Sequence, residues 1–283
     1  MKRQKRVAAI HDISGIGKCS LTAAIPVISA AGIEAAAMPT AVLSTHTGNI
    51  DGFTYRDLTN DIQPVADHWK SLGITFDGIY SGFLGSTEQV DIVCTFIDDF
   101  KSEQTVVIVD PAMADSGRMY TTFDKSFVKE MSLLCKKADI IVPNLTEAAF
   151  LLGEEYVEPP YSQEYIEGLM HRLYDSLAVP MIVLTGVSFE NDKIGCAVCE
   201  KGGDVFYRFS DKYSGIYYGT GDIFASALIA AYLNGKTIYK SAEIALDFTC
   251  SAIKRTFDAQ TDTRFGVNFE QGLGDFIKCL GGQ

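Results

Sequence analysis

A glycine-rich turn stands directly before a predicted helix in the segment YYGTGDIFASALIAAYLNG, residues 217–235. Gly219, Thr220 and Gly221 let backbone N–H groups approach an anion closely, and the helix terminus adds partial positive charge. The turn therefore predicts an anion hole for phosphate. Asp222 follows it, and a carboxylate beside a phosphate can take the proton of a substrate hydroxyl that attacks phosphorus. We predict that Asp222 is a catalytic base; the alternative is that it only caps the helix.

Further polar and glycine residues follow five short apolar runs. The runs are rich in β-branched residues and predict strands at residues 7–10, 78–80, 105–109, 140–142 and 181–184. After them come, in order, Asp12, the segment SGFLGS, Asp110, Asn144 and Thr185. Ligands of open parallel sheets bind outside the carboxyl ends of the strands. These residues together predict a site for phosphate and a metal ion.

Segments of helical period separate the strands that must position these residues. Apolar residues recur at helical spacing at Leu21, Ala24, Ile25 and Ile28, and again in residues 90–97. Ser86 and Gln89 have the spacing of a capping box before the second set. The alternation of strands and helices predicts an α/β fold with a mostly parallel central sheet flanked by helices in three layers. No linker interrupts it, so residues 1–283 are expected to form one domain.

Two segments look like a zinc-binding motif and a phosphate-binding loop but depart from what those motifs require. Cys196 and Cys199 form a CxxC, but they lie in an alternating apolar run that predicts a strand, where residues three apart point to opposite faces. The segment GIGKCS, residues 15–20, has Asp12 where a phosphate-binding loop needs glycine, and Cys19 where it needs Ser or Thr. Neither zinc chemistry nor a phosphate-binding loop is therefore expected there.

Composition and net charge limit the classes of partner that the protein is expected to bind. The 283 residues are 47% hydrophobic and 21% charged, which is ordinary for a globular protein. With 24 Lys and Arg against 36 Asp and Glu, the formal charge is −12, which argues against nucleic acid and anionic membranes as partners. The longest uncharged stretch, between Lys18 and Glu34, is too short to span a bilayer. Seven scattered cysteines suit a reducing compartment, so we expect a cytoplasmic protein.

The GTGD turn with its small-residue helix resembles a signature of the ribokinase-like (PfkB) kinases. Four more segments resemble the pyridoxal/pyridoxamine kinase branch in its own order: VLSTHTG at 42–48, YSGFLGSTEQ at 80–89, VDPAMAD at 109–115 and PNLTEAAFLLG at 143–153. The resemblance implies a ribokinase-like fold and phosphorylation of the 5′-hydroxymethyl group of a vitamin B6 vitamer by magnesium ATP. It also implies a homodimer.

Individual roles follow from this resemblance. Asp222 resembles the family's catalytic base, and Gly219, Thr220 and Gly221 its anion hole. Asp110 resembles the acidic residue near the metal and phosphates. Glu147 resembles the residue that organises Mg²⁺ through water, although Asn144 and Glu147 also have capping-box spacing. The remaining implied ATP-side residues are Asn144, Thr185 and Asp115, with Asp115, Arg118 and Tyr120 on a lid.

The substrate side departs from the family in two places. His46 and Thr47 match residues that line the pyridine pocket. Asp12 stands where better-known members have a serine, and a carboxylate there favours a protonated ring nitrogen or a donor group. Phe83 replaces a tyrosine, which keeps ring stacking and loses the hydroxyl. These differences keep open a hydroxymethylpyrimidine kinase, and a non-catalytic ligand-binding protein is the alternative from another class.

Overall fold

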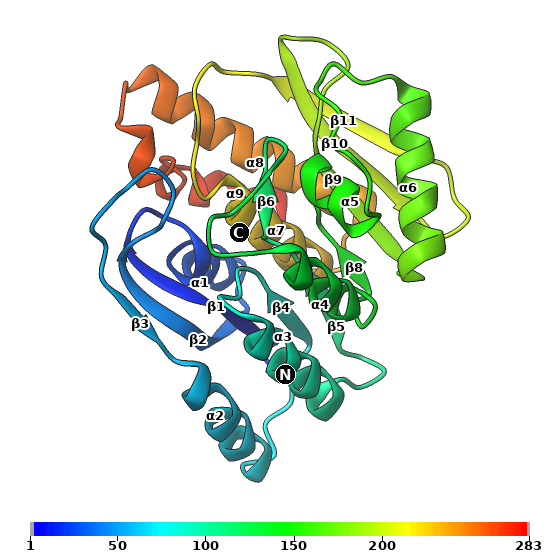
Figure 1. Ribbon diagram of the computed structural model, residues 1–283. Helices are drawn as coiled ribbons and strands as arrows, with labels where there is room; N and C mark the ends of the chain where they lie inside the picture. Colours follow the sequence, from blue (N-terminus) through cyan, green and yellow to red (C-terminus); the bar gives the residue numbers. More distant parts are fainter. Residues whose placement is uncertain (1–2, 282–283) are drawn as a thin grey trace.

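The computed structural model describes residues 3–281 and places nine strands in one sheet, in the order β11-β10-β9-β8-β5-β4-β1-β2-β3 (Figure 1). The neighbouring strands from β9 to β2 run parallel: β9 (Met181–Val187), β8 (Ile140–Ile141), β5 (Val106–Val109), β4 (Gly78–Ser81), β1 (Arg6–Ile16) and β2 (Glu34–Thr45). The edge strands are antiparallel: β10 (Lys193–Glu200), β11 (Phe206–Asp211) and β3 (Tyr55–Asp57).

Helices cover both faces of this sheet (Figure 1). One face carries α2 (Thr59–Ser71), α3 (Thr87–Phe100), α4 (Lys125–Cys135), α5 (Leu145–Leu151) and α6 (Gln163–Leu177). The other carries α1 (Ser20–Ala30), α7 (Thr220–Leu233), α8 (Ile238–Asp258) and α9 (Leu273–Cys279), with short 3₁₀ turns at Thr263–Phe265 and Glu270–Gly272. The predicted three-layer α/β architecture is confirmed.

Strand residues supply both hydrophobic cores by alternation. In β5, Val107 and Val109 are buried among the helices of one face and Ile108 among those of the other. Cys196 and Cys199 of β10 divide in the same way, which confirms that the two thiols point to opposite faces. Helix α7 lies between α1, α8 and the sheet, so it is buried on nearly all sides rather than along one stripe.

Strand β1 is longer than predicted, and Asp12 lies within it rather than after it. Residues Val7 to Ile10 pair with both β4 and β2, whereas the residues after Ile10 pair with β2 alone. The register shifts between His11 and Ile13, so Asp12 occupies an irregularity in the ladder. Asp12 still lies beyond the end of β4 and therefore at the carboxyl edge of the central sheet.

Strand β2 is not among the predicted strands; its run is rich in alanine and contains Pro39, and both residue types are uncommon in strand interiors. Pro39 is tolerated here because it stands opposite His11, beside the register shift. Two smaller expectations also need correction. Strand β9 continues two residues past Thr185, and Ser86 caps α3 by accepting from Gln89 N, but the Gln89 side chain bonds Gly85, Thr40 and Thr59 instead of completing the box.

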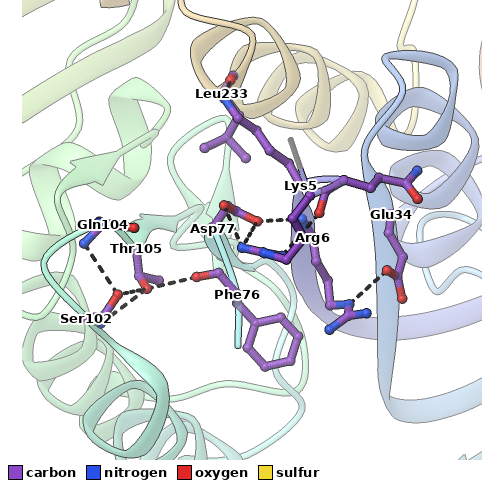
Figure 2. A network of polar contacts seen from close by, with 11 residues as sticks. Lys5, Arg6, Glu34, Phe76, Asp77, Ser102, Gln104, Thr105 and Leu233 are labelled. Carbon is purple, nitrogen blue, oxygen red and sulfur yellow. Dashed lines mark hydrogen bonds and ion pairs between the residues drawn. The ribbon is translucent and has the colours of Figure 1, made fainter. Parts of the chain in front are cut away.

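The amino edge of the sheet is held by a polar network (Figure 2). Asp77 accepts from the backbone N of Arg6 at 2.8 Å and pairs with Arg3 at 2.9 Å. Arg6 pairs with Glu34 of β2 at 2.9 Å, and Lys5 donates to the Leu233 carbonyl at the end of α7. The network joins β1, β2, β4 and α7 at the edge opposite Asp12.

Replacing Asp77 by Ala will lower the free energy of unfolding by about 2 kcal/mol, because the Arg6 N–H and the Arg3 guanidinium lose a charged acceptor. Urea denaturation measures this loss. The matched control is Asp98→Ala, whose 64% exposed side chain pairs with Lys137 at the surface and whose removal will cost less than about 0.5 kcal/mol. Equal losses in the two variants would contradict a stabilising role for the network.

No helix within residues 3–281 is long and apolar enough to cross a bilayer.

Candidate active site

The first turn of α7 is open to a ligand. Gly219 is the N-cap residue, with φ 72°, and no side chain caps the helix. Gly219 must be glycine, because a Cβ there would lie 2.3 Å from the Lys18 carbonyl oxygen. The Thr220 hydroxyl donates to the Tyr217 carbonyl and leaves the backbone N–H groups of the turn uncapped. This terminus therefore has the free donors that an anion hole requires.

Asp222 is the third residue of this helix, after Thr220 and Gly221, and is not its N-cap residue. Its side chain is 16% exposed. Burial raises the pKa of Asp222 to about 7; a hydrogen bond from the Ser20 backbone opposes this rise and the charge of Asp12 adds to it. A carboxyl with this pKa is half ionised near neutral pH, as suits a general base.

Asp110 faces the same helix terminus. It follows β5, and its backbone N donates to the Ser81 carbonyl oxygen at 2.9 Å. A Cβ built on Gly221 would lie 3.8 Å from Asp110 Oδ2, so the carboxylate lies against the GTGD turn. Burial, Glu147 and Asp222 all raise the pKa of Asp110 well above its usual range. The carboxyl groups of Asp110, Glu147 and Asp222 are therefore close enough for the charges of Glu147 and Asp222 to act on Asp110; we call these three groups the carboxyl cluster.

Asn144 and Glu147 form a complete capping box at α5. Asn144 Oδ1 accepts from Glu147 N, and Glu147 Oε2 accepts from Asn144 N, both at 2.9 Å. The same side chains reach the next segment, because Asn144 Nδ2 donates to the Ala114 carbonyl and Glu147 Oε1 accepts from Met113 N. Burial raises the pKa of Glu147 to about 8, against the effect of these N–H donors.

The donor set fits a hard divalent cation. Asp110 and Glu147 are 8% and 2% exposed, and their carboxylate oxygens are ligands that Mg²⁺ prefers. Within residues 3–281 no group of three or more His, Cys, Asp or Glu side chains is arranged to hold a metal by itself. Mg²⁺ is usually bound through one or two carboxylates together with substrate phosphates and water.

A short hairpin stands over the cluster. It consists of β6 (Ala114–Asp115) and β7 (Arg118–Met119), paired in antiparallel fashion, and it contains the exposed Asp115. Gly117 N donates to Thr146 Oγ1 at 3.0 Å and anchors the hairpin tip on α5. Tyr120, 38% exposed, follows directly. The predicted lid segment is thus a hairpin fixed to the residues that cap α5.

Asp12 lies on the other side of Asp222. It is 4% exposed, and both of its oxygens accept hydroxyl donors, from Ser20 at 2.6 Å and Ser14 at 3.0 Å. Burial raises the pKa of Asp12, while these two hydrogen bonds oppose the rise. The carboxylate therefore ties β1 to the first residue of α1.

His46 and Thr47 follow β2 at the rim of the site. His46 is 8% exposed and stacks on Tyr218, with ring centroids 4.8 Å apart. Its Nδ1 accepts from Gly48 N at 3.0 Å, so Nε2 carries the proton and donates to the Arg264 carbonyl. Thr47 is exposed. Gly17 makes room for the imidazole, because a Cβ there would lie 2.3 Å from His46 Cδ2.

Phe83 and Thr185, the remaining predicted site residues, contact protein groups outside the carboxyl cluster. Phe83 is half-buried and packs on Phe123, 5.5 Å between ring centroids. Thr185 donates from both its backbone N and its hydroxyl to the Pro143 carbonyl, at 2.9 and 3.3 Å, and so adjoins Asn144. The structure thus gathers Asp12, Asp110, Glu147, Asp222 and the GTGD turn, with His46 at the rim, and leaves Thr47 and Asp115 at the surface.

Sequence reasoning missed several residues that build this site. His11 is fully buried with Nδ1 3.9 Å from Asp222 Oδ1. Tyr218 provides the stacking partner of His46, and Gly17 lets the rejected GIGKCS segment pack against that ring. The signals were present, since His11 adjoins Asp12 and Tyr218 adjoins GTGD, but their distances to other segments could not be derived from the sequence.

Comparisons with known proteins agree on one family. The model of the family described as phosphomethylpyrimidine kinase matches residues 17–266. A Bacteroides thetaiotaomicron protein provisionally named a phosphomethylpyrimidine kinase, crystallised with pyridoxal, is 36% identical, with a TM-score of 0.92 over 97% of this chain and 96% of that one. Pyridoxal kinase from Lactobacillus plantarum is 30% identical, with a TM-score of 0.89 over 98% of both chains.

Both substrate names recur among the relatives. The hydroxymethylpyrimidine/phosphomethylpyrimidine kinase of Aquifex aeolicus is 30% identical over 184 residues, which are 63% of this chain and 68% of that protein. The nine-strand, mostly parallel sheet flanked by helices is the fold of the pyridoxal kinase structure. The chain belongs to the phosphomethylpyrimidine kinase family of ribokinase-like kinases.

Proposed function

We propose that this kinase transfers the γ-phosphoryl group of ATP to the 5′-hydroxymethyl group of a vitamin B6 vitamer: pyridoxal, pyridoxine or pyridoxamine. The observation that carries the transfer is Asp222, a buried carboxyl with a pKa of about 7 in the uncapped first turn of α7. The substrate class is supported by the relative crystallised with pyridoxal, which is 36% identical over nearly the whole chain.

Asp222 acts as the general base in this proposal. The substrate oxygen attacks the γ-phosphorus, its proton passes to the Asp222 carboxylate, and the bond from the γ-phosphorus to the ADP oxygen breaks. Backbone N–H groups of Gly219, Thr220 and Gly221 hold the transferring phosphoryl group, where the helix dipole favours negative charge. These groups bind phosphate locally, so the formal charge of −12 does not oppose ATP binding.

Asp110 and Glu147 would hold Mg²⁺, which when bound neutralises charge on the phosphates. Glu147 already accepts two backbone N–H donors, so we propose that it acts through a water molecule. Asn144, Thr185 and Asp115 are the proposed contacts on the ATP side. Asn144 has both ends of its amide engaged, so its contribution is to hold the hairpin and the Pro143 turn in place.

Asp12, His46, Thr47 and Phe83 form the proposed substrate side. In this proposal Asp12 also accepts from the ring nitrogen or from a hydroxyl or amine substituent, beside the Ser14 and Ser20 hydroxyls that it already binds. His46 has both ring nitrogens bonded to backbone groups, so its contribution to an aromatic substrate is the face or edge of its ring.

Replacing Asp12 by Ser, the residue expected at this place in better-known members, will raise KM for the vitamer about tenfold and change the order of preference among vitamers. The reason is the loss of a charged acceptor, worth about 1.5 kcal/mol or more. Steady-state kinetics with three vitamers measures it, and Asp211→Ser at the far sheet edge, in β11, is the control. Unchanged KM values and preference would remove Asp12 from the substrate site.

A hydroxymethylpyrimidine kinase is the second candidate, favoured by the match to the phosphomethylpyrimidine kinase model. A panel of pyridoxal, pyridoxine, pyridoxamine and hydroxymethylpyrimidine, each with magnesium ATP, separates the two. We expect the highest kcat/KM with a B6 vitamer and a product heavier by one phosphoryl group. A preference for the pyrimidine would favour the second candidate, and binding without turnover of any alcohol would favour a non-catalytic homologue.

Assembly and location complete the proposal. We propose a homodimer, as the family resemblance implies, which predicts a molar mass by light scattering of twice the chain mass of 30.9 kDa; the chain mass itself would contradict it. We also propose a reducing, cytoplasmic location. All seven cysteines lie within residues 3–281 and each is unpaired, which suits such a compartment.

A further inference from the structure

His11 is a buried imidazole beside the proposed base with no hydrogen-bond partner on either ring nitrogen. Its Nδ1 lies 3.9 Å from Asp222 Oδ1, just beyond hydrogen-bonding distance. Buried polar side chains are nearly always bonded, so an unsatisfied pair of ring nitrogens needs an explanation. The imidazole is positioned to complete a contact that tightens when the site is occupied.

The surroundings fix the ring in this place. Tyr80 contacts it edge to face, with centroids 4.3 Å apart and the planes at 73°. A Cβ built on Gly82 would lie 2.3 Å from His11 Nδ1, so Gly82 of the SGF segment leaves the space that the ring occupies. Strand β1 holds the backbone of His11 opposite Pro39. The glycine and the strand pairing together aim Nδ1 at the helix terminus.

We propose that His11 is a positioning residue for Asp222: the neutral imidazole donates its Nδ1 proton to Asp222 Oδ1 and leaves Oδ2 to receive the proton of the substrate hydroxyl. Closing the gap from 3.9 Å to a hydrogen bond requires a shift of about 1 Å. His11 itself exchanges no proton in the reaction. This inference rests on the proposed role of Asp222 as the base.

The charges around Asp222 explain why a neutral donor suits this position. Burial lowers the pKa of His11 to about 3, so the imidazole stays neutral and does not compete with Asp222 for the proton of the substrate hydroxyl. The groups whose charge or hydrogen bonds act on Asp222 from neighbouring elements are Asp12 and the Ser20 N–H, while Asp110, Cys19 and Tyr80 lie close enough to feel its charge. Against these acidic neighbours, an N–H donor stabilises the ionised carboxylate without adding a second titrating base.

The tautomer of His11 tests the contact without any turnover. The chain has four histidines, and ¹⁵N NMR of the full-length protein at pH 8.5, with the His11 signal identified by its loss in His11→Gln, distinguishes protonation at Nδ1 from that at Nε2. We expect the Nδ1–H tautomer for His11. His46 is the internal reference, because its contacts with Gly48 and Arg264 require Nε2–H. An Nε2–H tautomer at His11 would overturn the proposal.

Three variants test the consequence for catalysis. His11→Leu removes the donor and will lower kcat about 10-fold to 100-fold, the range for a hydrogen bond to a charged group, with KM for the alcohol within about twofold. It will also move the acidic limb of the kcat–pH profile upward. His11→Asn keeps an amide N–H near the Nδ1 position and will recover most of the loss, whereas His11→Gln places its amide near Nε2 and will not.

The outcomes separate this inference from the proposed function. Wild-type kcat and pH profile in His11→Leu, or an Asn variant as impaired as Leu, would overturn the positioning role while leaving the kinase assignment intact. Absence of turnover in the wild-type protein would overturn the function, and the tautomer measurement would still decide whether the contact forms. If His11→Leu fails to fold, judged by circular dichroism, the wild-type tautomer and the Asn and Gln pair carry the decision.

Discussion

The Asp222→Asn variant will fold as the wild type does and lose kcat by about 10²-fold to 10⁴-fold, because the amide cannot accept the proton of the attacking hydroxyl. The change is nearly isosteric at a side chain that is 16% exposed, so packing is preserved. Steady-state turnover with magnesium ATP and a B6 vitamer measures the loss, and KM for ATP will change little. Near-normal turnover would contradict the assignment of Asp222 as the base.

The activity of the wild-type protein is expected to depend on pH through the ionisation of Asp222. Asp222 is active when ionised, and its pKa in the free protein is raised to about 7, so wild-type kcat/KM for the vitamer will fall as the pH drops below about 7. That limb will be absent from the residual activity of Asp222→Asn. The control is Asp258→Asn on the surface of α8, where the carboxylate pairs with Lys254 and its loss will leave both kcat and the profile unchanged.

The Gly219→Ala variant will lower kcat/KM for ATP by about 10²-fold. A Cβ at Gly219 would lie 2.3 Å from the Lys18 carbonyl oxygen, and this neighbour is backbone that cannot rotate away. The first turn of α7 must therefore shift, and displacement of about 1 Å in a group that positions the reacting atoms costs about this much. Initial rates over a range of ATP concentrations measure the effect.

Gly235 provides a matched control at the other end of the same helix. It follows the carboxyl end of α7 with φ 83°, close to the 72° of Gly219, but a Cβ there would meet nothing within 4 Å. Gly235→Ala will cost about 1 kcal/mol of stability from the left-handed backbone and leave the kinetics unchanged. If the two alanine variants lose activity equally, backbone strain rather than the position of the turn would explain the loss.

Much of the fold could be predicted because the parallel core is locally encoded. Each of the runs rich in β-branched residues became a strand, and Val90, Val93 and Ile97 became a buried helix face. Strand β2 could not be predicted in this way. Its alanines and Pro39 lack strand propensity, and it forms because β1 offers a long partner and a register shift that spares the missing N–H.

The site could be predicted as far as residues that follow strands or stand in the glycine-rich turn before a helix. Asp12 and Asp110 were found in the first way, because the carboxyl ends of parallel strands share one edge, and Asp222 was found in the second way. His11 and Tyr218 were not, since they act through contacts with segments distant in sequence, at Asp222 and His46. His11 lies on the same face of β1 as Val7, which packs against the α7 side, but its distance to Asp222 depends on how α7 packs on the sheet, which no local pattern reports.

Asn144 and Glu147 show why a motif can support two interpretations at once. The capping-box interpretation is confirmed, since both reciprocal hydrogen bonds are present. Glu147 nevertheless lies near enough to Asp110 to raise its pKa, so the side chain that caps α5 also borders the proposed metal position. A carboxylate has four lone-pair sites, which leaves room for a water-mediated contact beside the two N–H donors.

The most direct test of the central claim is transfer of label from [γ-³²P]ATP to pyridoxal by the wild-type protein and by Asp222→Asn, with Mg²⁺ present. We predict that label appears in pyridoxal 5′-phosphate in proportion to the ADP formed, and that the variant transfers it about 10²-fold or more slowly. Label released only as inorganic phosphate, or transferred equally well by the variant, would contradict the account.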